Sequence, residues 1–142
     1  MTDREWLDSL ELFGMKLGLE AMGRLAGVLG HPERSAPVVH IAGTNGKGSV
    51  AAMVERGFRA AGLRTGRYTS PHLDRIEERV AIDGTPVSPE AFADATAHVM
   101  DAVDRCRAAG TLTVSPTFFE VSTATAFEIF RREKVQIGRA HV

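Results

Sequence analysis

Several residue types are scarce in this sequence, and each scarcity excludes a class of protein. Cys106 is the only cysteine, which excludes an internal disulfide and agrees with a reducing cytosol. No apolar run approaches the roughly 20 residues needed to cross a bilayer, and the acidic start is unlike a signal peptide. We therefore predict a cytoplasmic protein without a membrane partner.

Charge of either sign is not in excess either. The 17 basic and 18 acidic side chains give a formal net charge of -1, so a broad surface for nucleic acid is not expected and any anion site must be local. Lysine is rare, with only Lys16, Lys47 and Lys134. The 142 residues, 44% of them hydrophobic, can bury one core, and we predict a monomer.

The most informative stretch is 38–50, where a short β-favouring run leads into a glycine-rich loop and then a helical pattern. Its glycines can adopt backbone angles closed to other residues, which lets several N–H groups point at one phosphate. A helix that opens at about Ser49 adds its unpaired N–H groups and the positive end of its dipole. Lys47 adds a full charge, and the Ser49 hydroxyl could bind a phosphate or Mg²⁺. The three glycines are Gly43, Gly46 and Gly48.

This loop differs from the strict phosphate-loop pattern G-x-x-x-x-G-K-[ST]. Ile41 stands where the first glycine belongs, and Gly48 separates Lys47 from Ser49. An ordinary glycine-rich turn between a strand and a helix is the alternative. Because both flanking patterns are present, we predict a phosphate site.

Hydrophobic periodicity predicts the other elements. Strands are expected at Val38–Ile41 and 63–70, with a small surface hairpin that pairs 79–82 with 85–87 through Asp83-Gly84. Helices are expected at 2–13, 19–29, 49–61, 88–109 and 115–130. One side of the third helix is apolar, made of Val50, Met53, Val54, Phe58 and Ala61. The order strand, helix, strand predicts a parallel pair with a right-handed connection.

Two further places draw attention by position. Ser70-Pro71-His72 follows the second strand and should share its sheet edge with the glycine loop, although a plain turn is the alternative. Glu120 lies inside an apolar helix, where its carboxylate either contacts a ligand or caps the helix start. No cluster of cysteine or histidine has zinc spacing.

Together these motifs resemble the amino-terminal part of the folylpolyglutamate synthase and dihydrofolate synthase family, in the Mur ligase superfamily. Residues from Trp6 to Lys134 carry the resemblance. The resemblance implies an α/β fold, namely a truncated P-loop-containing ATP-binding domain of parallel strands with flanking helices and a small β-hairpin. The matching motifs are 40–49, 68–73, 78–80 and 117–120, supported by 15–20.

The family's chemistry implies roles for individual residues. ATP phosphorylates the terminal carboxylate of a folate, and the acyl phosphate is attacked by the amine of L-glutamate. By resemblance, Lys47 is the charge stabiliser, and Ser70 with Ser49 binds Mg²⁺. The ATP phosphates are expected on Gly43, Thr44, Asn45, Gly46, Lys47, Gly48 and Ser49. The folate or dihydropteroate is expected on Met15, Lys16, Leu17, Gly18, Phe118, Phe119 and Glu120.

The resemblance ends after Lys134. Residues 135–142 are unlike the family's continuation, so we interpret them as a truncated reading frame or foreign terminal residues, with the glutamate-binding domain absent. The chain alone is therefore expected to be inactive. Two alternatives are a nucleotide-binding module of another class, such as a small-molecule kinase, and a fragment that only binds nucleotide or a partner.

Overall fold

The computed structural model describes residues 2–10, 19–112 and 115–141. Five strands within these residues form one sheet in the order β1-β5-β2-β3-β4. Strands β1, β5 and β2 are parallel, and β3 is antiparallel to both β2 and β4. The bounds are Val38–Ile41 (β1), Thr65–Thr69 (β2), Val80–Ile82 (β3), Thr85–Pro86 (β4) and Ile137–His141 (β5).

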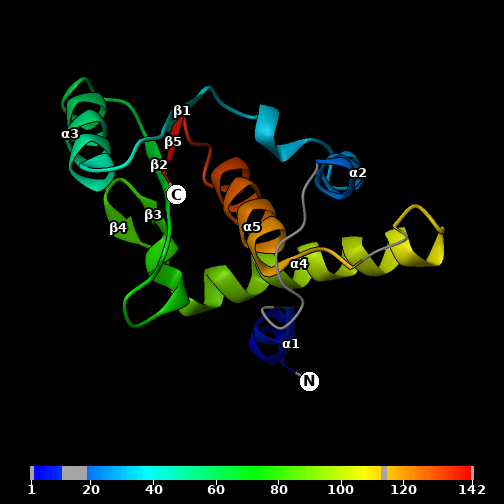
Figure 1. The fold of residues 1–142 in the computed structure, drawn as a ribbon. Helices are drawn as coiled ribbons and strands as arrows, with labels where there is room; N and C mark the ends of the chain where they lie inside the picture. The colour runs from blue at the N-terminus through cyan, green and yellow to red at the C-terminus, as the bar shows by residue number, and fades with distance from the viewer. Residues whose placement is uncertain (1, 11–18, 113–114, 142) are drawn as a thin grey trace.

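The helices lie on both faces of this sheet. Figure 1 shows α3 on one side of the strands and α5 on the other, with α4 crossing beneath α5. Short 3₁₀ turns occur at Pro32–Arg34 (η2) and Ile76–Arg79 (η3). The α-helices are Asp3–Leu10 (α1), Glu20–Val28 (α2), Lys47–Ala60 (α3), Pro89–Ala108 (α4) and Phe118–Arg132 (α5). The predicted α/β class is confirmed.

The parallel relation predicted for the first two strands is confirmed, but β1 and β2 are not neighbours. Strand β5 lies between them, and Ile41 and Thr69 both pair in register with His141. The carboxyl ends of β1 and β2 are therefore two strand spacings apart, about 10 Å. Both connecting loops leave the same edge of the sheet, as expected.

The hairpin forms where it was predicted, but it is not a separate surface element. Asp83 and Gly84 both have positive φ, 49° and 82°, which suits a two-residue turn that matches the strand twist. Strand β3 also pairs with β2, and Val80 and Ala81 are fully buried. The hairpin thus extends the main sheet.

The core lies where α4 packs on α5 and α5 packs on the sheet (Figure 1). The predicted stripe of α4 is buried as expected, and it includes the thiol of Cys106. Its members are Phe92, Ala95, Val99, Val103 and Cys106. Helix α5 is buried on more than one face, also as predicted. Trp6 and Leu7 of α1 and Leu25 of α2 complete the same core.

Two helices differ in detail from what their sequence patterns indicate. The apolar side of α3 is not its buried side, because Val50 is 44% and Met53 is 66% exposed while Ala51 and Glu55 are buried. Helix α5 begins at Phe118 rather than after Ser115, because Thr117 forms a capping box with Glu120 and satisfies the first free N–H groups there.

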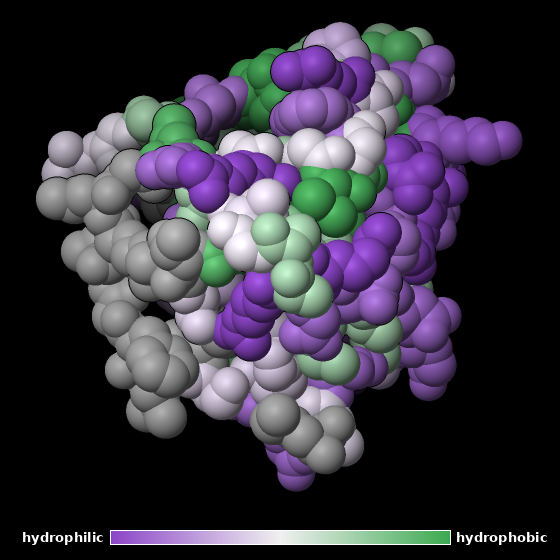
Figure 2. Space-filling view, turned by 90° about the vertical axis from the view of Figure 1, so that its right-hand side faces the viewer, coloured by the Kyte–Doolittle hydropathy of each residue, from purple (hydrophilic) through white to green (hydrophobic). Residues whose placement is uncertain are grey.

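The surface is mixed in character. On the face shown in Figure 2, hydrophilic residues cover much of the described surface, and hydrophobic residues gather in separate groups. Within the described residues, no helix combines the length and the apolar character that a bilayer crossing requires.

Candidate nucleotide and substrate site

The glycine loop connects β1 to α3 in a conformation that few residues other than glycine adopt. Gly46 has φ +74° and is the N-cap of α3, and Gly43 has φ +151°. The Gly46 carbonyl accepts the first helical hydrogen bond from the Val50 N–H at 3.0 Å. The helix therefore starts at Lys47, two residues earlier than predicted, and Gly48 and Ser49 lie in its first turn.

The start of α3 has the features of an anion site. No side chain caps this helix end, where the first N–H groups of an α-helix have no partner within the helix itself. A Cβ on Gly43 would lie 3.9 Å from Lys47 Cγ, so the Lys47 stem runs close over the loop. Residues 42–46 are exposed, as are Gly48 and Ser49, whereas Lys47 is half-buried. Backbone donors and one cation thus share one solvent-facing turn.

The loop after β2 is held by side chains from η3. Arg79 Nε donates a hydrogen bond of 2.8 Å to His72 Nδ1, which leaves the ring proton of His72 on Nε2. Glu78 accepts from the N–H groups of Leu73 (2.9 Å), Asp74 (3.2 Å) and Arg75 (3.0 Å). These contacts fix the turn that carries Ser70 to the same edge as the glycine loop.

The hydrogen bonds to Glu78 also affect its ionisation. The backbone N–H groups, that of Leu73 above all, stabilise the carboxylate and lower the pKa of Glu78. The ionised carboxylate of Glu78 is therefore the form that holds the loop after Ser70.

The three predicted substrate residues at the start of α5 differ in what they can contact. Phe118 is buried, and the guanidinium carbon of Arg79 lies 5.0 Å from its ring centroid. Phe119 is 47% exposed. Glu120 Oε2 accepts from the Thr117 N–H at 2.7 Å, so the helix-capping alternative for this carboxylate is the one the structure shows. Phe119 is thus the ring available to a ligand.

Phe119 lines an apolar cavity of about 200 Å³ between α5 and the sheet. Its ring centroid lies 6.4 Å from that of Tyr68, whose hydroxyl is 2.8 Å from Ser122 Oγ. His40, next to the end of β1, lines the same cavity. The structure therefore brings a predicted substrate residue close to the strand that leads into the glycine loop.

Four of the predicted substrate residues lie outside the part of the chain that the structure describes. Met15, Lys16, Leu17 and Gly18 are not among the described residues.

For Mg²⁺, the predicted ligands are the hydroxyls of Ser49 and Ser70. Among the described side chains, no group of three or more histidine, cysteine, aspartate or glutamate residues could hold a metal ion.

Sequence reasoning did not assign a role to three residues that shape the site. Arg79 links His72 to Phe118, and Tyr68 and His40 line the cavity beside Phe119. Arg79 and Tyr68 each belong to a short motif already noted, at 78–80 and 68–73. Their side-chain direction depends on η3 and on the order of strands, which no local pattern reports.

Comparison with known proteins agrees with this geometry, although no family model matches the chain. The chain is 37% identical over 130 residues to the dihydrofolate synthase/folylpolyglutamate synthase of Bacillus subtilis, which covers 89% of this chain and 29% of the relative. The corresponding Mycobacterium tuberculosis enzyme is 40% identical over 129 residues, covering 87% of this chain and 26% of the relative. The chain thus spans less than a third of these relatives.

Solved structures give the same result. Folylpolyglutamate synthase from Mycobacterium tuberculosis complexed with ADP superposes with a TM-score of 0.89 at 37% identity, covering 98% of this chain and 31% of that structure. The folylpolyglutamate synthetase from Lactobacillus casei superposes with a TM-score of 0.89 at 33% identity, covering 100% of this chain and 36% of that structure. On sequence and fold together, this chain belongs to the folylpolyglutamate synthase and dihydrofolate synthase family.

Proposed function

We propose that the loop from Gly43 to Ser49 binds the phosphates of ATP. The observation that carries this proposal is Gly46, whose left-handed conformation opens α3 without a side-chain cap at the sheet edge shared with Ser70. The amino-terminal end of a helix attracts negative charge, and Lys47 adds a cation within the same turn. Family structures complexed with ADP and AMPPCP support this placement.

The hydroxyls of Ser49 and Ser70 are the proposed Mg²⁺ ligands. They follow β1 and β2 at one edge, and His72, Arg79 and Glu78 hold the second loop in place. Hydroxyl oxygens suit a hard cation that keeps several waters. When bound, Mg²⁺ neutralises charge on the phosphate oxygens.

The proposed folate or dihydropteroate site includes Phe119 and the cavity beneath it. A flat ring system can stack on the exposed Phe119 ring, and the neighbouring Phe118 is buried in contact with Arg79. Glu120 contributes by fixing the start of α5. The segment from Met15 to Gly18 completes the proposed site. A family structure in complex with AMPPCP and folate supports this assignment.

The proposed reaction is the ATP-dependent addition of L-glutamate to a folate. The terminal carboxylate of the folate takes the γ-phosphoryl group, and the glutamate amine then displaces phosphate to form an amide, with ADP as the other product. Lys47 and the N–H groups of the loop stabilise the charge that develops during phosphoryl transfer. We assign the complete activity to a longer parent protein, of which 1–134 is the amino-terminal part and 135–142 a non-family tail.

The experiment that tests the proposal has two parts. Calorimetric titration of the chain with MgATP is expected to show binding, because the loop and α3 are complete in this chain. Incubation with MgATP, L-glutamate and either a tetrahydrofolate or dihydropteroate is expected to show no glutamylated product from the chain alone. Failure to bind MgATP would overturn the nucleotide assignment, and phosphorylation of another small molecule would favour the kinase class.

A further inference from the structure

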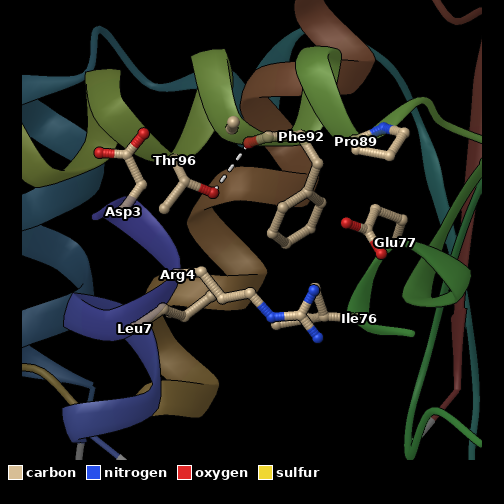
Figure 3. Close-up of a pocket in the computed structure, with 9 residues that line it drawn as sticks. Asp3, Arg4, Leu7, Ile76, Glu77, Pro89, Phe92 and Thr96 are labelled. Carbon is tan, nitrogen blue, oxygen red and sulfur yellow. Dashed lines mark hydrogen bonds between the residues drawn. The ribbon is translucent and has the colours of Figure 1, made fainter. Parts of the chain in front are cut away.

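A second cavity lies away from the nucleotide edge, between α1, η3 and α4. It has a volume of about 220 Å³. Figure 3 shows α1 and α4 on two sides of it and Glu77 of η3 entering from a third. None of the residues proposed for nucleotide, metal or folate lines this cavity. Its lining is Asp3, Arg4, Leu7, Ile76, Glu77, Pro89, Phe92, Ala93 and Thr96.

The carboxylate of Glu77 is the unusual feature of this cavity. Glu77 is only 7% exposed, and its Oε2 has no hydrogen-bond partner among the described residues. The ion pair with Arg75 Nε, at 3.6 Å, is longer than a hydrogen bond. In Figure 3 the carboxylate lies beside the ring of Phe92. A buried carboxylate oxygen without a donor is costly, so this oxygen is a vacant acceptor.

The residues that line the cavity determine which ligand could donate a hydrogen bond to Glu77 Oε2. Leu7, Ile76 and Phe92 are buried and give the cavity an apolar lining. The Thr96 hydroxyl already donates to the Phe92 carbonyl at 2.9 Å. The lining includes the carboxylates of Asp3 and Glu77 and the guanidinium of the exposed Arg4, and Arg75 Nε lies 3.6 Å from Glu77 Oε2 without being part of the lining. The buried carboxylate oxygen of Glu77 therefore lacks an N–H donor at hydrogen-bonding distance, which a cationic N–H group could supply.

We propose that this cavity binds a small organic cation, an amidinium or a primary ammonium on a compact apolar body, whose N–H group donates to Glu77 Oε2. The size agrees, because a cavity of about 150 Å³ holds benzene and this one is larger by about the volume of two water molecules. An amidinium is the best match, because its planar pair of N–H groups fits a carboxylate.

Benzamidine and benzamide form the test pair. The two have almost the same shape, but only benzamidine is a cation. Titration of the whole chain, followed by NMR or calorimetry, is expected to show benzamidine binding at least tenfold tighter than benzamide. No benzamidine binding below about 10 mM, or equal binding of the two, would overturn the proposal.

Variants locate the binding. Glu77→Gln removes the buried charge without changing the shape, so it is expected to fold and to bind benzamidine at least tenfold more weakly. Asp94→Asn, an exposed change on α4, is the matched control and is expected to bind as the wild type does. Ala93→Leu fills the cavity and is expected to abolish binding. Unchanged affinity in either Glu77→Gln or Ala93→Leu would place benzamidine elsewhere and sink the proposal.

Discussion

At the scale of single residues, Glu78 is the clearest case of a side chain that organises a loop. Its carboxylate accepts three consecutive backbone N–H groups, and these bonds lower its pKa below the ordinary 4.5. A lowered pKa in the folded state means that the ionised form stabilises the fold. This contribution is present above pH 4.5 and is lost as the pH falls through the folded-state pKa.

We predict that Glu78→Ala lowers the free energy of unfolding at neutral pH and that its difference from the wild type shrinks in acid. Urea unfolding from about pH 6 down to about pH 3 measures this difference. Asp94→Ala, which removes an exposed carboxylate of α4, is the control. A difference between wild type and Glu78→Ala that is constant over the whole pH range would contradict the assigned role.

At this scale, the sequence predicts a feature correctly where the feature depends only on neighbouring residues. The glycines and Lys47 form one turn, as predicted, because their conformational freedom and their spacing are properties of neighbouring residues. Glu120 remained open between two roles, although Thr117 three residues earlier is the capping-box partner. Phe118 rather than Phe119 is the buried ring, and its contact with Arg79, 39 residues earlier in the chain, is one that local sequence does not indicate.

At the scale of elements, the approach of α5 to the sheet depends on a missing side chain. A Cβ on Gly66 of β2 would lie 2.6 Å from two ring carbons of Phe130, which is buried in α5. Carbon atoms do not approach so closely, so a side chain at this position would force the ring or the helix to move. Gly66 is therefore required here by packing rather than by its backbone angles.

We predict that Gly66→Ala lowers the free energy of unfolding by about 1–3 kcal/mol, the usual cost of overpacking a core. Gly57→Ala is the matched control, because it lies within α3 with no other atom within 4 Å of its Cβ. That change should stabilise the chain by about 0.5–1 kcal/mol. Both values come from urea unfolding, and a Gly66→Ala chain as stable as the wild type would show that α5 is not packed as described.

The orientation of α3 shows a limit of periodicity at this scale. Its apolar residues share a side, as the sequence indicated, yet the helix turns Ala51 and Glu55 toward the sheet. The reason lies in β5, whose Arg139 is 2% exposed and pairs with Glu55 Oε2 at 2.7 Å. A buried glutamate is not expected from hydropathy, so the helical pattern selects the wrong face.

At the scale of the molecule, the same ion pair connects residues 84 positions apart in the chain. Burial lowers the pKa of the Arg139 guanidinium, and the bond to Glu55 opposes that shift. Arg67 Nε lies 3.9 Å from the same carboxylate oxygen. The pair thus joins α3, β5 and β2 within the interior.

We predict that Arg139→Ala costs about 3–5 kcal/mol of unfolding free energy, because Glu55 would stay buried without its main partner. The double change Glu55→Leu with Arg139→Leu should restore stability to the wild-type level or above, since apolar residues of similar size need no partner. Thermal and urea unfolding of the wild type, of Arg139→Ala and of the double variant measures these differences in stability. A double variant that is as unstable as Arg139→Ala, or less stable, would contradict this account.

Strand β5 was not predicted, and its composition explains why. A parallel strand buried on both faces normally reads as a continuous apolar run, but Ile137–His141 includes Gly138, Arg139 and His141. Its position between β1 and β2 follows from the sheet as a whole rather than from its own residues. The interpretation of 135–142 as foreign to the family stays a prediction, which sequencing the genomic locus beyond Lys134 would test.

The most direct measurement is the affinity of the chain for MgATP, by calorimetry, with and without Lys47. We predict that Lys47→Ala weakens binding roughly 10- to 100-fold, the worth of a hydrogen bond to a charged group, while its circular dichroism spectrum stays that of the wild type. Arg56→Ala removes an exposed cation from the same helix and should bind as the wild type does. A folded Lys47→Ala chain with wild-type affinity for MgATP would contradict the assignment of this loop.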